Sequence, residues 1–156
     1  MIQTMRRKDR ALSGEEAMKV LQEGEYGILS TCDGQGQPYA TPVNYVLEGS
    51  KLYFHCALSG QKLDNIRENP KVCFATVGAT EVLPQRLTSR YESAIAYGQA
   101  QLVEDPGEKR MALLLLCAKY APEDIAHARG QIRAMLEKTG VVRLDIDLVT
   151  GKANRG

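Results

Sequence analysis

The chain has 156 residues, a length that fits one domain with a single packed core. Its 20 basic and 19 acidic residues leave a formal charge of +1, so no overall field draws it to nucleic acid or to a membrane. No apolar run reaches the length of a membrane span, and Met1 to Gly14 contain no apolar secretion core, so the sequence predicts a cytoplasmic protein.

The four cysteines are scattered along the chain without a CxxC pair, and only two histidines could add metal ligands. This spacing does not favour a zinc site, and a reducing compartment favours free thiols. Cys32 and Cys73 fall in apolar, strand-like runs, where cysteine behaves as a small hydrophobic residue. We therefore expect no bound metal.

A short helix is expected at the start of the domain, after an N-terminal arm formed by residues 1–10. Ser13 and Glu16 have the spacing of a capping box, apolar residues then recur on one face, and Gly24 closes the segment. The sequence therefore predicts a helix between Ser13 and Gly24.

Three strands are expected next. Residues 26–32 and 37–47 flank the turn sequence Asp-Gly-Gln-Gly and predict a hairpin. A second turn at 48–50 leads into a strand over 51–56. Because strands joined by short turns usually pair, we expect a meander in which 51–56 lies within pairing distance of 37–47.

The middle of the chain predicts one helix and two further strands. A helix over 60–69 is expected to cross between strands and to stop at Pro70. Strands are expected at 71–77 and 89–103, separated by the less regular stretch 78–88. These strands extend the same sheet.

Two helices and a last strand complete the prediction. Asp105 caps a helix that ends near Tyr120, and a second helix runs from Pro122 to Gly140. The apolar face of the first is expected to consist of Met111, Leu114, Leu115 and Ala118. Residues 142–148 alternate apolar and polar, which predicts a half-buried strand, followed by a turn at Gly151-Lys152.

The order of these elements predicts an antiparallel α+β domain spanning residues 1–156, rather than a Rossmann-type fold. The sequence motifs of serine hydrolases, dinucleotide-binding folds, P-loop proteins and zinc proteases are absent. Any chemistry must therefore come from a less familiar arrangement.

Two residues in the expected strands suggest a ligand. Pro42 cannot donate to a strand ladder, so either it protects an exposed edge or something other than a strand approaches it. His55 is expected nearby, where a histidine in an apolar run is usually a hydrogen-bonded core residue and less often a functional one. Both interpretations stay open for each residue.

The segment Ser59-Gly60-Gln61-Lys62 opens the expected helix over 60–69. Free backbone N–H groups, a hydroxyl and an ammonium could converge there on a phosphate, although a solvated lysine is the simpler interpretation. Together with Pro42, Asn44 and His55, this segment outlines a site for a flat, phosphorylated cofactor.

Several segments in chain order carry a family resemblance. They are Met5-Arg6-Arg7-Lys8-Asp9-Arg10, Pro38-Tyr39, Pro42-Val43-Asn44-Tyr45, Tyr53-Phe54-His55, Gly60-Gln61-Lys62, Asn69-Pro70 and Val72-Cys73-Phe74. The sequence resembles the Nim-type 5-nitroimidazole resistance proteins, within the pyridoxamine 5'-phosphate oxidase-like, FMN-binding split-barrel superfamily. The resemblance implies a split β-barrel homodimer that holds FMN at the subunit interface.

The resemblance also implies which residues contact FMN. Those beside the isoalloxazine would be Thr41, Pro42, Val43, Asn44, Phe54, His55 and Cys56, and those at the phosphate Ser59 and Lys62. The second subunit would contribute Ser89, Arg90, Tyr91 and Ser93 of the partner subunit. Arg90 has a structural ion pair as its alternative role. His55 would orient or protonate a substrate next to the flavin.

The function that the resemblance implies is an FMN-dependent oxidoreductase that reduces nitroaromatic or related small electrophiles with an electron donor. A related oxidase of the pyridoxamine-phosphate kind is one alternative. A protein that binds flavin, deazaflavin or haem without turnover is another, with His55 as a ligand in the haem case. A cofactor-free interaction module is the third.

Overall fold

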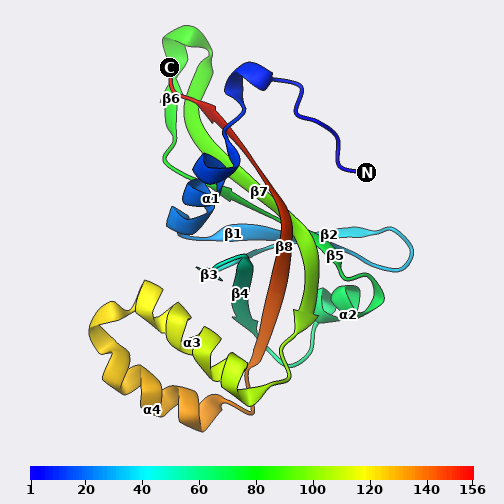
Figure 1. Cartoon of the computed structure of the whole chain (residues 1–156), viewed down its shortest axis with the longest axis vertical. Helices are drawn as coiled ribbons and strands as arrows, with labels where there is room; N and C mark the ends of the chain where they lie inside the picture. Colours follow the sequence, from blue (N-terminus) through cyan, green and yellow to red (C-terminus); the bar gives the residue numbers. More distant parts are fainter.

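The computed structural model describes all residues 1–156 (Figure 1). Its strands are β1 (Gly27–Cys32), β2 (Pro38–Val43), β3 (Val46–Glu48), β4 (Lys51–Cys56), β5 (Lys71–Val77), β6 (Glu81–Leu83), β7 (Thr88–Leu102) and β8 (Gly140–Asn154). Its α-helices are α1 (Gly14–Glu23), α2 (Gln61–Glu68), α3 (Pro106–Tyr120) and α4 (Ile125–Met135). Three short 3-10 helices lie at Lys8–Arg10, Pro84–Arg86 and Pro122–Asp124.

All strand pairs are antiparallel, and the strands follow the order β2-β1-β5-β7-β8-β4-β3, with β6 paired to β7 off that path. The long strands β7 and β8 lie at the centre of the sheet, and β1 and β2 run across them (Figure 1). The outermost strands, β2 and β3, are joined by only Asn44 and Tyr45. Because that link draws the two ends of the sheet together, the sheet forms a split β-barrel, which confirms the predicted α+β class.

The first helix forms as its sequence predicts. The Glu16 N–H donates to the Ser13 hydroxyl at 3.2 Å, and the Ser13 N–H donates to the Glu16 carboxylate at 2.9 Å. This capping box satisfies two donors that an uncapped helix would leave free. Ala17, Val20 and Leu21 form the buried face of α1.

The predicted hairpin of 26–32 with 37–47 forms, and Val46 and Leu47 at the end of the second segment pair with β4, but the meander is not continuous because β2 itself pairs only with β1. The expected strand over 37–47 breaks at Asn44-Tyr45, where the backbone N–H and carbonyl of Tyr45 bond to α3 side chains instead of a strand. The three residues of β3 then occupy the edge of β4. His55 consequently lies opposite Val141 rather than beside Pro42.

The last strand is longer than predicted and includes Gly151 and Lys152, which do not form a turn. A β-bulge interrupts its pairing, since Tyr97 faces Leu148 while Gly98 faces Ile146. The extra residue shifts the alternation of faces along β8. Leu148 is therefore 42% exposed, although the predicted pattern placed it inside.

The predicted face of α3 is also wrong. Its buried residues are Ala112, Leu113 and Leu116. Residues 111–118 are apolar on every side, so helical periodicity alone cannot choose which face turns inward. Helix α4 ends at Met135 and not near Gly140.

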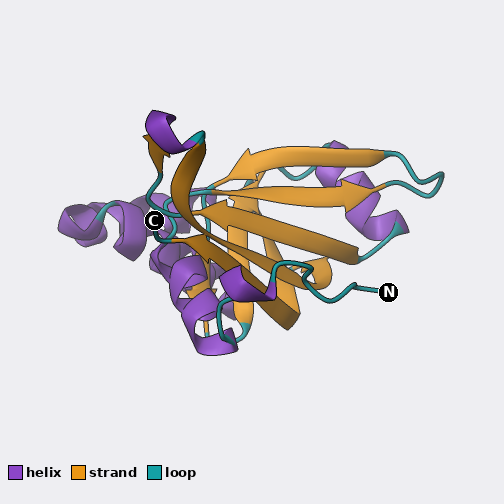
Figure 2. Ribbon diagram, turned by 90° about the horizontal axis from the view of Figure 1, so that it is seen from above, coloured by secondary structure: helices purple, strands orange, loops and turns teal.

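Two apolar clusters cover both faces of β4. Leu52 and Phe54 face the barrel interior, in the cluster that includes Leu21 and Phe74. Tyr53 belongs to the second cluster, under α3 and α4. Figures 1 and 2 show this helix pair on one side of the sheet, apart from α1. No helix of the structure is long and apolar enough to cross a bilayer.

Candidate functional site

His55 lies where β4 leaves the core. Tyr53 and Phe54, just before it, are at most 1% exposed, whereas His55 itself is exposed. The core interpretation of this histidine is therefore wrong. Partial desolvation, together with the nearby cation of Lys62, holds the pKa of His55 below its ordinary value of 6.5. At neutral pH the imidazole is uncharged, so one ring nitrogen donates a hydrogen bond and the other accepts one.

Lys62 stands in the first turn of α2, close to the end of β4. Its charge opposes the effect of burial on the thiol of Cys56, whose pKa is raised overall. Gly60 caps α2 with φ +149, a value that residues with a side chain rarely adopt, and no side chain bonds to the first N–H groups of the helix. The structure thus brings His55, Cys56 and Lys62 together beside an uncapped helix N-terminus.

Ser59 and Phe54, two other predicted residues near Lys62, differ in whether their side chains can reach a ligand. Ser59 is exposed just before α2. The side chain of Phe54 is fully buried in the barrel core, so only its backbone is available to a ligand.

The predicted residues of β2 lie on an edge strand. Thr41 and Val43 are half-buried, and Pro42 and Asn44 are exposed. Pro42, Val43 and Asn44 line an open hollow of about 400 Å³. Because β2 pairs only with β1, Pro42 does occupy an unpaired edge, as one of its two interpretations expects. The approach of a ligand to this edge stays a prediction.

The predicted residues of β7 lie at the other end of the molecule, near the C-terminus (Figure 1). Arg90 forms an ion pair with Glu81 at 2.9 Å, which is the structural alternative considered for it. The side chain of Asn154 donates to the Ser89 carbonyl at 2.7 Å, and the Ser93 hydroxyl donates to the Lys152 carbonyl at 3.4 Å. One subunit does not join these residues to His55, so their contribution across an interface stays a prediction.

An apolar pocket of about 500 Å³ opens beside His55. Its lining comes from the end of β4, from α3 and α4, and from the segment before β8: His55, Cys56, Ala57, Leu113, Cys117, Ala128, Gln131, Ile132, Met135 and Thr139. Sequence reasoning missed this pocket. The available signal was the all-round apolar surface of α3, which indicates a helix covered on more than one side.

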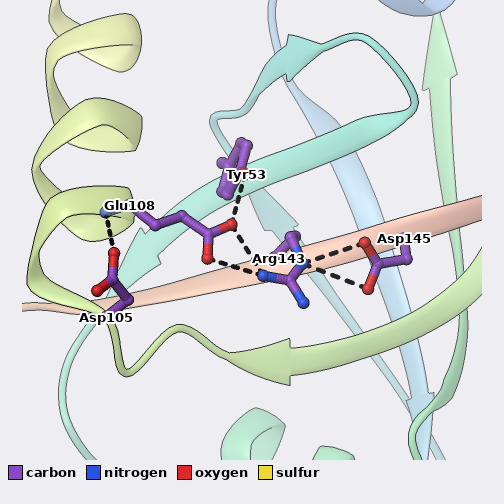
Figure 3. Close-up of polar contacts among 5 residues, drawn as sticks. All are labelled: Tyr53, Asp105, Glu108, Arg143 and Asp145. Atoms are coloured by element: carbon purple, nitrogen blue, oxygen red, sulfur yellow. Dashed lines mark hydrogen bonds and ion pairs between the residues drawn. The ribbon is translucent and has the colours of Figure 1, made fainter.

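A polar cluster fixes the start of α3 (Figure 3). Leu113 and Cys117, further along this helix, line the pocket. Both oxygens of the Glu108 carboxylate accept from the Arg143 guanidinium at 2.8 Å, and one also accepts from the Tyr53 hydroxyl at 2.7 Å. Arg143 Nε donates to Asp145 at 3.0 Å. These hydrogen bonds, with Tyr53 foremost, hold the pKa of Glu108 below its ordinary value.

The other end of α3 is attached to the link between β2 and β3. The Tyr45 N–H donates to the Tyr120 hydroxyl at 2.9 Å, and Lys119 Nζ donates to the Tyr45 carbonyl at 2.8 Å. The same ammonium lies 3.9 Å from the centre of the Tyr45 ring, and burial lowers the pKa of Lys119. Helix α3 is therefore attached at its start to β8 and at its end to the segment between β2 and β3.

The whole domain matches a known family. Residues 13–153 match the family described as Pyridoxamine 5'-phosphate oxidase. The chain belongs to this pyridoxamine 5'-phosphate oxidase-like family. The split-barrel fold of the structure agrees with that assignment.

Individual relatives are more distant. The uncharacterized protein RA0666 of Rhizobium meliloti (strain 1021) is 40% identical over 63 residues, which is 40% of this chain and only 40% of that protein's length. The FAD and heme binding protein from Mycobacterium smegmatis is similar in structure, with a TM-score of 0.79, 22% identity, and coverage of 92% of this chain and 72% of that one.

A second similar structure comes from Bacteroides thetaiotaomicron VPI-5482, a protein whose assignment to 5-nitroimidazole antibiotic resistance is provisional. It has a TM-score of 0.74 and 23% identity, with coverage of 91% of this chain and 85% of that one. At these identities the two structural likenesses establish the fold.

Proposed function

We propose that this protein is an FMN-binding oxidoreductase that reduces nitroaromatic, 5-nitroimidazole-like or related small electrophiles, and that it acts as a homodimer with FMN at the interface. One observation carries the proposal: an exposed, uncharged His55 lies beside the cation of Lys62 and an uncapped helix N-terminus, at the mouth of an apolar pocket. Flavin-binding relatives of the same fold support it.

The residues present fit a phosphorylated flavin. Lys62 forms no ion pair within the chain, and the first N–H groups of α2 have no side-chain cap, so both are available to a phosphate. Ser59 adds a hydroxyl at the same end. The edge of β2 from Thr41 to Asn44 and the backbone of β4 would hold the ring system.

Bound FMN would supply the redox chemistry between an electron donor and the substrate. The protein supplies position. His55 would donate a hydrogen bond from its neutral ring to the electron-accepting group of the substrate, because a pKa below the ordinary range leaves the imidazole uncharged at neutral pH with one N–H to donate. The pocket walls from α3 and α4 would exclude water from that contact.

A second candidate is a protein that binds haem or flavin without turnover. A specific observation favours it, because a single exposed histidine beside an apolar pocket is also how a haem ligand is presented. The similar structure from Mycobacterium smegmatis is named for binding both FAD and haem. A haem absorption band in the purified protein would decide for this candidate.

The test is a reductase assay with NADH or NADPH and metronidazole, on wild type and two variants. Lys62→Ala should weaken FMN binding about 10- to 100-fold through loss of a charge-assisted hydrogen bond. His55→Ala should keep FMN but lower kcat about 100-fold. Lys71→Ala, which removes an exposed lysine of β5, is the matched control. Full activity of His55→Ala, or unchanged affinity for FMN in Lys62→Ala, contradicts the assignment.

A further inference from the structure

The pocket between β4 and the α3–α4 pair carries information about the substrate that the flavin-binding segments do not. We infer that it selects an uncharged, flat, fused-ring acceptor, larger than a single nitroimidazole ring. This inference deepens the proposed function, on which its reduction step rests. The binding step stands on the pocket alone.

The lining explains the preference for an uncharged ligand. None of its residues is a lysine, arginine, aspartate or glutamate, and the apolar residues Leu113, Ala128 and Ile132 of the lining are buried. His55 is the one imidazole there, and it is neutral at physiological pH. A charged ligand would lose its hydration without gaining a counter-ion from the lining, which is costly in an apolar site, and the nearest cation, Lys62, lies outside the lining and is assigned to the flavin phosphate.

The size of the pocket points to more than one ring. An apolar cavity of about 150 Å³ is enough to hold benzene. The pocket of about 500 Å³ is roughly three times larger, which leaves room for two or three fused rings. A substrate reduced by flavin must also lie flat against its ring, so the extra volume is best filled by a planar system.

The position of the pocket sets the orientation of such a ligand. His55, Cys56 and Ala57 form the side nearest to Lys62 and α2, whereas Gln131 and Met135 form the outer side on α4. The polar group that accepts electrons would therefore lie at His55, and the apolar rings would extend under α3 and α4. Met135 is 53% exposed at the rim, and its flexible side chain suits ligands of differing outline.

The experiment is titration calorimetry of the full chain, as purified and after saturation with FMN, using prodan, an uncharged naphthalene. Ala57→Phe and Cys117→Phe fill the pocket from opposite walls, and Ala126→Phe adds the same side chain on the exposed face of α4 as a control. We expect prodan to bind wild type and the control equally, and to bind the two filled variants at least about tenfold more weakly.

Three results would overturn the inference: no prodan binding by wild type, equal binding by Ala57→Phe, or equally tight binding of the anionic naphthalene 8-anilinonaphthalene-1-sulfonate. Loss of dimer formation in Ala57→Phe, measured by sedimentation, would also overturn it, because the pocket would then hold a second copy of the chain. Circular dichroism checks that each variant is folded. Failure of the proposed function is a separate result, namely no FMN uptake by wild type while prodan still binds.

Discussion

Replacing Arg143 with methionine is expected to loosen α3 from the barrel. The arginine joins β8 to the first turn of α3 through Glu108, whose carboxylate also accepts a hydrogen bond from the hydroxyl of the buried Tyr53 (Figure 3). Methionine keeps most of the aliphatic stem but removes the cation. Glu108 is then left partly buried without its ion-pair partner.

The size of the effect follows from the burial of the pair. The side chains of Arg143 and Glu108 are 17% and 21% exposed. Exposed ion pairs contribute about 0–1 kcal/mol, whereas breaking a buried pair costs about 3–5 kcal/mol, so we expect Arg143→Met to lower the free energy of unfolding by about 2–3 kcal/mol. For a chain of this length that corresponds to a fall in Tm of about 4–12 °C.

Urea unfolding followed by circular dichroism measures this change, provided that the m-value stays constant. The control is Arg67→Met, because Arg67 pairs with Asp64 at 3.6 Å with both side chains more than half exposed, and its loss should cost less than about 1 kcal/mol. The double variant Arg143→Met/Glu108→Gln should recover part of the lost stability, since no buried charge is left alone. A loss for Arg143→Met no greater than that of the control would refute the reasoning.

Four further predictions concern stability and protonation. Because the folded pKa of Glu108 is depressed, the stability it contributes is present above the ordinary value of 4.5 and is lost as pH falls through the folded pKa. Acid unfolding should show this loss in wild type and a smaller one in Arg143→Met; identical pH dependence would contradict it. Gly98→Ala should destabilise the protein by at least about 2 kcal/mol, because a Cβ there would lie 2.0 Å from a backbone oxygen of β8. Gly14→Ala, which meets nothing within 4 Å in the first turn of α1, should instead stabilise it by about 0.4–1 kcal/mol in the same urea assay, and a loss would count against this account of the helix. Lys62→Gln should raise the pKa of His55 toward 6.5 in an NMR titration, and an unmoved midpoint would place Lys62 too far away to act on it.

Local signals predicted most of the fold. The capping box of α1, Asp105 as the N-cap of α3, and the turn between β1 and β2 each depend on residues close together in sequence. The parts of the fold that were predicted wrongly depend on residues far apart in the sequence. The break at Tyr45 is fixed by Tyr120 and Lys119, which are 75 and 74 residues away in sequence. The sequence around β2 contains no pattern that predicts these contacts with α3.

The candidate site was predictable to a similar degree. Helix-opening chemistry pointed to Lys62 from the sequence, and the structure places that lysine beside His55. The exposure of His55 was not predictable, because its neighbours Tyr53 and Phe54 are deeply buried and it follows them directly. The pocket depends on how α3 and α4 pack, and the all-apolar segment 111–118 leaves that packing undetermined.

The most direct test of the central claim is the visible absorption spectrum of the freshly purified protein, followed by release and identification of any chromophore before and after addition of FMN. The account predicts a flavin spectrum, release of FMN, and uptake of added FMN that Lys62→Ala weakens. A haem band, or a chain that remains colourless and takes up no FMN, would contradict it.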